Sequence, residues 1–224
     1  MLYYKTKLLK VYDFCIYTIR EEVTLLGKTH MIIGVASSLA ITGPTTAPKF
    51  LIAVALGAAG AVISDIDVET SNIHRNIGKV ILLTMVAIVI LGLDIFLKTG
   101  IFHKITEDSS ILRIAGGCLI FIIICAFGKE QPHRTFMHSF LALFLLDCAL
   151  ALIWPHLISY FTIGFLSHLA LDILNKKKLS LWYPLRGGFC MGLFCADGLA
   201  NQIFYIAGCI VAGIEMILFV LRII

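Results

Sequence analysis

The chain has 224 residues, of which 59% are hydrophobic and only 14% are charged, and its mean hydropathy is +0.96. A soluble domain of this size cannot bury so much apolar surface, so the composition excludes a soluble globular protein and indicates an integral membrane protein in a lipid bilayer. The net charge is only +4, and without a pattern of basic and aromatic residues no nucleic-acid partner is expected.

Residues 1–29 precede the first apolar run, and we interpret them as a separate N-terminal extension. They lack the uninterrupted apolar core and the small-residue cleavage site of a signal peptide. Leu8, Leu9, Tyr12 and Ile16 recur at helical spacing among lysines, which is typical of an amphipathic helix on a membrane surface. A disordered extension is the alternative, and both interpretations stay open. The remainder, 30–224, is predicted to be a single helical membrane domain.

Long apolar runs predict an all-α fold, a polytopic membrane protein with about seven hydrophobic helices. The predicted helices are 31–43, 50–64, 79–98, 111–127, 136–154, 157–175 and 201–223. The first two are short for a bilayer that takes about 20 residues to cross, and the turn "TGPTTAPK" joins them. They form either a tilted pair of spans or a re-entrant hairpin, and in both cases the chain returns to its original side.

The basic residues are distributed unequally between the two sides of this topology. The side with the N-terminus carries 13 of the 18 lysines and arginines, and the opposite side carries five. Cytoplasmic loops are the ones enriched in lysine and arginine, so the N-terminus is predicted to be cytoplasmic. The expected location is therefore the bacterial cytoplasmic (inner) membrane, crossed several times.

The unusual polar residues gather at the ends of predicted helices on that same side. They are His30, Asp65, Asp67, His133, Arg134, His138, His168 and Asp172. An ionisable group within a membrane is costly unless it is paired or bound to a metal, so convergence of several such groups predicts a metal or catalytic site. Taken singly, each has an ordinary interpretation: a hydrogen-bonded histidine, a helix-capping aspartate or a basic membrane anchor.

Helical spacing supports this convergence. His30, Gly34, Ser38 and Thr42 lie four residues apart on one helix face, and the same is true of Ala53, Gly57, Ala61 and Asp65 on the next helix. Small residues let membrane helices approach closely, so an antiparallel pair would place His30 and Asp65 at the same height. The aspartates of "SDIDVETS" can share one pocket only if the helix ends there.

Imidazole and carboxylate ligands without thiolates favour a hydrolytic zinc, manganese or iron centre. The candidate ligands are His30, Asp65, Asp67, His133, His138, His168 and Asp172. A catalytic zinc takes three protein ligands and a water, so seven candidates imply either two ions or supporting residues around one, with zinc favoured. The seven cysteines lie in apolar runs without a CxxC pair and are interpreted as small apolar residues. A spare histidine such as His133 would accept a proton, and Arg134 would hold an anionic oxygen.

Four ordered blocks, "KTHMIIG", "SDIDVETS", "HRTFMHS" and "FLSHLALDIL", resemble those of the YdjM-type bacterial inner-membrane proteins. That family is described as membrane-bound metal-dependent hydrolases, some of them regulated by LexA in the SOS response. The resemblance covers about residues 28 to 185 and implies that the seven candidate ligands match the family's recurrent polar residues.

These observations predict a membrane-bound, metal-dependent hydrolase with its site at the cytoplasmic face. Its substrate is expected to be a phosphoester or other ester of an amphiphile or lipid, because a site at that depth can reach lipid headgroups. A metal-ion or small-molecule transporter and a membrane stress protein with a structural metal are the alternatives. The oligomeric state is not predicted.

Overall fold

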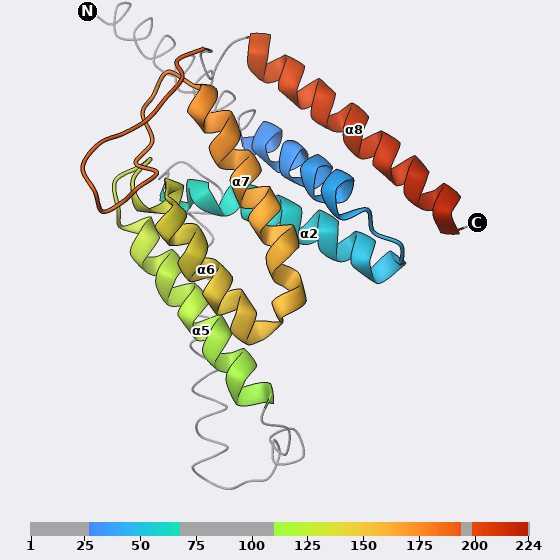
Figure 1. The fold of residues 1–224 in the computed structure, drawn as a ribbon, viewed down its shortest axis with the longest axis horizontal. Helices are drawn as coiled ribbons and strands as arrows, with labels where there is room; N and C mark the ends of the chain where they lie inside the picture. The colour runs from blue at the N-terminus through green and yellow to red at the C-terminus, as the bar shows by residue number, and fades with distance from the viewer. Residues whose placement is uncertain (1–26, 68–109, 194–198, 224) are drawn as a thin grey trace, which may run out of the picture.

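The computed structural model describes residues 27–67, 110–193 and 199–223. Within these ranges it contains six α-helices and no β-strand, which confirms the all-α prediction (Figure 1). The six helices match six of the seven predicted ones, and the predicted helix 79–98 lies outside the described residues, as does most of the N-terminal extension.

The first two described helices form an antiparallel hairpin. A helix over 27–42 is followed by a turn at Gly43 and by α2 (Ala47–Ile63), which has a proline in its first turn. A Cβ atom added to Gly34 would collide with the Ala61 side chain and the Gly57 carbonyl. The two helices therefore pack almost backbone to backbone, through the small residues that the sequence predicted.

Helix α7 (Ile158–Leu174) crosses α2 obliquely with the same chain direction, and this pair forms the centre of the molecule (Figure 1). The main chains meet where Gly164 contacts the Gly57 carbonyl, and a Cβ on Gly60 would collide with the Phe161 carbonyl. Because the helices run in the same direction, their C-terminal ends lie together at one end of the bundle.

Helices α5 (Ser110–Lys129) and α6 (Phe140–Ile153) pack against each other and complete that bundle (Figure 1). A short 3₁₀ helix, η2 (Phe136–His138), precedes α6, and another, η3 (Pro155–Leu157), joins it to α7. The apolar core between these helices includes Phe161, Phe165 and Leu146, all fully buried or nearly so.

The last helix, α8 (Leu199–Ile223), lies along the outside of the hairpin (Figure 1). Phe219 of α8 stacks on Phe50 with ring centroids 4.3 Å apart. The rest of the apolar surface of α8 is largely exposed. Four helical segments among the described residues are long and apolar enough to cross a membrane: Ala47–Asp67, Ile111–Lys129, Pro155–Leu174 and Leu199–Arg222. Exposed apolar helix surface is expected where lipid is the surrounding solvent.

Candidate metal centre

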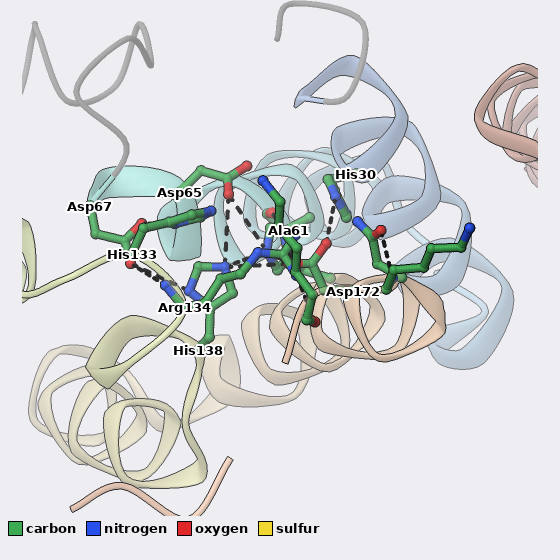
Figure 2. A network of polar contacts seen from close by, with 12 residues as sticks. His30, Ala61, Asp65, Asp67, His133, Arg134, His138 and Asp172 are labelled. Carbon is green, nitrogen blue, oxygen red and sulfur yellow. Dashed lines mark hydrogen bonds and ion pairs between the residues drawn. The ribbon is translucent and has the colours of Figure 1, made fainter. Parts of the chain in front are cut away.

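The structure brings all eight predicted polar residues together at one end of the bundle (Figure 2). Each has a side-chain contact of 3.9 Å or less with another member of the group. Their convergence is thus a finding, whereas the assignment of each as a ligand or a catalytic residue stays a prediction.

Two local features of the chain aim these side chains. Helix α2 ends at Ile63 and continues as the 3₁₀ helix η1 (Ser64–Asp67), so the helix end that a shared pocket for the aspartate pair requires is present. In the tighter 3₁₀ turn, Asp65 reaches the centre of the cluster and Asp67 reaches its edge. On α7, His168 and Asp172 are one turn apart on a common buried face.

Two imidazoles and a carboxylate form the centre of the cluster. His138 Nε2 and His168 Nε2 lie 3.3 Å apart, and Asp65 Oδ1 lies 3.9 and 3.7 Å from them. An ion in the plane of three atoms so spaced and equidistant from them would be about 2.1 Å from each, which is the length of zinc bonds to histidine and carboxylate. Asp172 Oδ2, 3.6 and 3.9 Å from the same two nitrogens, forms a second triangle of the same size.

The protonation pattern of His168 strengthens this fit. His168 Nδ1 lies 2.7 Å from the Ala61 carbonyl, which can only accept, so this nitrogen carries the proton and Nε2 has a free lone pair. His138 Nδ1 faces Asp67 Oδ2 at 3.4 Å without a hydrogen bond among the described residues. The Nε2 lone pair of His168 therefore faces His138 Nε2 and carboxylate oxygens, an arrangement that a shared cation would satisfy.

The charge of the cluster also suits a divalent cation. Three carboxylates, those of Asp65, Asp67 and Asp172, face one guanidinium, that of Arg134. With neutral imidazoles the net charge is two negative, which one divalent ion would balance. Burial alone would lower the pKa of His138, but the surrounding carboxylates, Asp67 foremost, raise it above its usual value. The same negative potential attracts a metal.

The edge of the cluster is open to solvent at His133. This side chain is 38% exposed, and its Nδ1 lies 2.8 Å from Asp67 Oδ1. The neighbouring Arg134 has a φ of 67°, in the left-handed region that few non-glycine residues adopt. Its main-chain N–H donates to Asp67 Oδ2 at 3.3 Å and its Nη2 lies 3.2 Å from Asp172 Oδ2. Asp67 thus holds both residues in place.

His30 lies on the other side of the centre. Its ring centroid is 4.1 Å from that of His168, and its Nε2 is 3.5 Å from Asp172 Oδ1. The buried His30 Nδ1 has no hydrogen-bond partner in the part of the chain that the structure describes. His30 is positioned to orient Asp172 from the side away from His138.

Sequence reasoning missed two main-chain groups of the site. The Ala61 carbonyl selects the protonated nitrogen of His168, and the Lys177 carbonyl accepts from Arg134 Nη1 at 3.1 Å. A signal existed for the first, because Ala61 lies one helical turn before Asp65 on the predicted packing face. None existed for the second, since the sequence does not specify how the segment after α7 folds back.

Fold and site together define a helical membrane protein with a buried histidine–aspartate cluster at one end of its bundle. The model of the YdjM inner membrane protein family matches residues 25–223, so the chain belongs to this family and the resemblance seen in its sequence is confirmed. Neither the comparison with curated proteins nor that with solved structures gave a match. Family and helices agree on a location in the inner membrane.

Proposed function

We propose that this protein is a membrane-bound hydrolase that uses one divalent metal ion, preferably zinc. The observation that carries the proposal is the meeting of His138 Nε2 and His168 Nε2, 3.3 Å apart, with Asp65 and Asp172 against both. His168 offers only its Nε2, because its Nδ1 donates to the Ala61 carbonyl, and this Nε2 faces that of His138. One shared ion therefore fits better than two.

The surrounding residues supply what hydrolysis requires in addition. A bound divalent ion acts as a Lewis acid and lowers the pKa of water. His133, exposed and oriented by Asp67, can accept a proton at the ring nitrogen that Asp67 does not contact and pass it to solvent. Arg134 holds Asp172 and places a positive charge where an anionic oxygen of a substrate would lie.

The depth of the site favours an ester or phosphoester of an amphiphile. Both α2 and α7 end at the cluster, which supports a site at the level where membrane-spanning helices meet the headgroup region. Among the described residues, seven basic residues lie at this end (Lys28, Lys129, Arg134, Lys176, Lys177, Lys178 and Arg186) and three at the other (Lys49, Arg113 and Arg222). The positive-inside rule therefore supports a cytoplasmic orientation for this end of the bundle.

The test combines metal analysis with hydrolysis by the purified protein. Metal content and cleavage of lipid and soluble phosphoesters would be measured for wild type, His138→Ala and Asp172→Asn. His156→Ala is the matched control, because this exposed histidine lies in η3 at the opposite end of the bundle. We expect both site variants to lose metal and activity and the control to keep both. Undiminished cleavage by either site variant would refute the proposal.

One observation favours the transport alternative. A cavity of about 960 Å³ opens at the opposite end, and its lining includes Lys49, Asp147 and His156. Between this cavity and the metal centre, however, the buried rings of Phe161 and Phe165 fill the core. Metal flux into proteoliposomes that His138→Ala abolishes, without any hydrolysis by wild type, would establish transport instead.

A further inference from the structure

The segment that follows α7 has an unusual composition. Residues 175–193, "NKKKLSLWYPLRGGFCMGL", carry four basic residues and no acidic one. Their net charge of +4 equals that of the whole chain of 224 residues. We refer to residues 175–193 as the basic loop.

The basic loop is folded onto the protein by its main chain. Leu179 and Phe189 exchange two main-chain hydrogen bonds of 2.9 Å, and Met191 N–H donates to the Ile173 carbonyl at 2.7 Å. Leu179 is fully buried against the core. The remaining side chains of the loop are thus presented by a defined scaffold.

That scaffold turns large apolar side chains outward. Trp182 is 69% exposed and Leu185 is 71% exposed, and Phe189, Met191 and Leu193 are also exposed. The four basic side chains, Lys176, Lys177, Lys178 and Arg186, are exposed as well. Exposed apolar side chains interspersed with cations, in a segment whose own sequence has no acidic residue, are typical of a surface that inserts at the membrane interface.

The loop is joined directly to the metal centre. Ser180 N–H donates to the Arg134 carbonyl at 3.0 Å, and the Lys177 carbonyl accepts from Arg134 Nη1 at 3.1 Å. The Leu181 carbonyl accepts from the N–H of Phe140, the first residue of α6, at 3.0 Å. Whatever the loop contacts is therefore held beside the cluster.

We propose that the basic loop lies on the anionic phospholipid headgroups of the leaflet that the metal site faces. Anionic lipid is the partner that fits, because it supplies negative charge for the four cations and an apolar layer for Trp182, Leu185 and Phe189 at the same depth. An acidic protein surface would match the charges but would leave no reason for the apolar side chains beside them. The proposal has a second part, which rests on the proposed function: anionic phospholipids are also the class of substrate that the site hydrolyses.

The chain has only two tryptophans, Trp154 and Trp182, which permits a direct test. The Trp154→Phe variant keeps Trp182 as the sole reporter, in nanodiscs of brominated lipid with or without anionic phosphatidylglycerol. We expect anionic lipid to strengthen the quenching at least about twofold, since each basic residue near an anionic surface is attracted to it. A triple variant, Lys176→Gln, Lys177→Gln and Lys178→Gln, should abolish this dependence on lipid charge.

The controls separate this proposal from the proposed function. Trp182→Phe leaves Trp154, at the opposite end, whose quenching should not depend on lipid charge. The triple variant should keep its metal, because it retains the Lys177 carbonyl. Equal quenching of Trp182 in both lipids, or quenching by aqueous acrylamide alone, would overturn the proposal even if metal content and hydrolysis were as proposed. Loss of hydrolysis with intact lipid-dependent quenching would count against the proposed function only.

Discussion

Replacing Gly164 with alanine is the sharpest test of how helix packing sets the metal site. A Cβ at this position would lie 2.9 Å from the Gly57 carbonyl carbon and 3.0 Å from its Cα, and closer still to the carbonyl oxygen. These are main-chain atoms that cannot rotate away, so α7 and α2 must separate by roughly 1 Å. Overpacking of this kind costs about 1–3 kcal/mol, and the gain in helix propensity offsets about 1 kcal/mol of it.

The same displacement would reach the ligands, because His168 is on α7 and Asp65 follows α2. Lengthening their 3.7 Å separation by about 1 Å would move the equidistant point from about 2.1 to about 2.4 Å from the ligand atoms, beyond the usual zinc bond length. We expect the free energy of unfolding to fall by about 0–2 kcal/mol and zinc affinity to fall about ten- to a hundredfold.

Thermal unfolding in detergent and chelator competition for zinc would measure the two effects. Gly116→Ala, on α5, is the matched control, because nothing lies within 4 Å of a Cβ there. It should leave both quantities unchanged or slightly raise stability. Wild-type zinc affinity in Gly164→Ala would refute the reasoning that links the glycine contact to the site.

Three further predictions concern the site and its supports. Removing metal with a chelator should lower the Tm of wild type but not that of His138→Ala. The reason is that an ion at a hundredfold excess over its Kd stabilises the folded state by about 2.7 kcal/mol. Equal Tm shifts in both proteins would contradict a metal site at His138. Arg134→Gln should keep its metal but lower kcat/KM about a hundredfold, the usual effect of losing one charged transition-state contact; loss of metal content would assign Arg134 a structural role instead. Ser139→Ala should destabilise the protein by about 1 kcal/mol, because the buried Ser139 hydroxyl caps α6 by accepting from Ala142 N–H at 3.1 Å. Substitution of the exposed Ser159 by alanine is the control. Equal free energies of unfolding for the two variants would count against the cap.

Much of the site could be predicted from the sequence because the membrane limits the alternatives. His30, Asp65, His138 and Asp172 each lie at the end of an apolar run, where an unpaired ionisable group would be costly. An even number of predicted spans separates these residues, which places them on one side of the membrane. Small residues at helical spacing predicted the close hairpin that the structure contains. These inferences need only the period of a helix and the polarity of the solvent.

Atomic roles could not be predicted, because they depend on how the helices pair. Seven residues were equivalent candidate ligands, whereas in the structure Asp67 faces His133 and the Nδ1 of His138, and not the central Nε2 atoms. The left-handed backbone of Arg134 has no local signal, since arginine is not a residue that favours it. The fold of the basic loop depends on contacts across the chain that no local pattern encodes.

The pairing of α2 and α7 in the same chain direction explains how packing and chemistry are connected. Along both helices, the contacts advance by one turn of four residues: Gly57 meets Gly164, and the Ala61 carbonyl then meets His168 Nδ1 at 2.7 Å. One turn further on, Asp65 and Asp172 each lie within 3.9 Å of His168 Nε2. Three successive turns therefore supply close packing, the selected tautomer and the carboxylates. Because Gly164 lies one turn before His168 and Gly57 two turns before Asp65, the register that the glycine contact sets determines which oxygen faces which nitrogen.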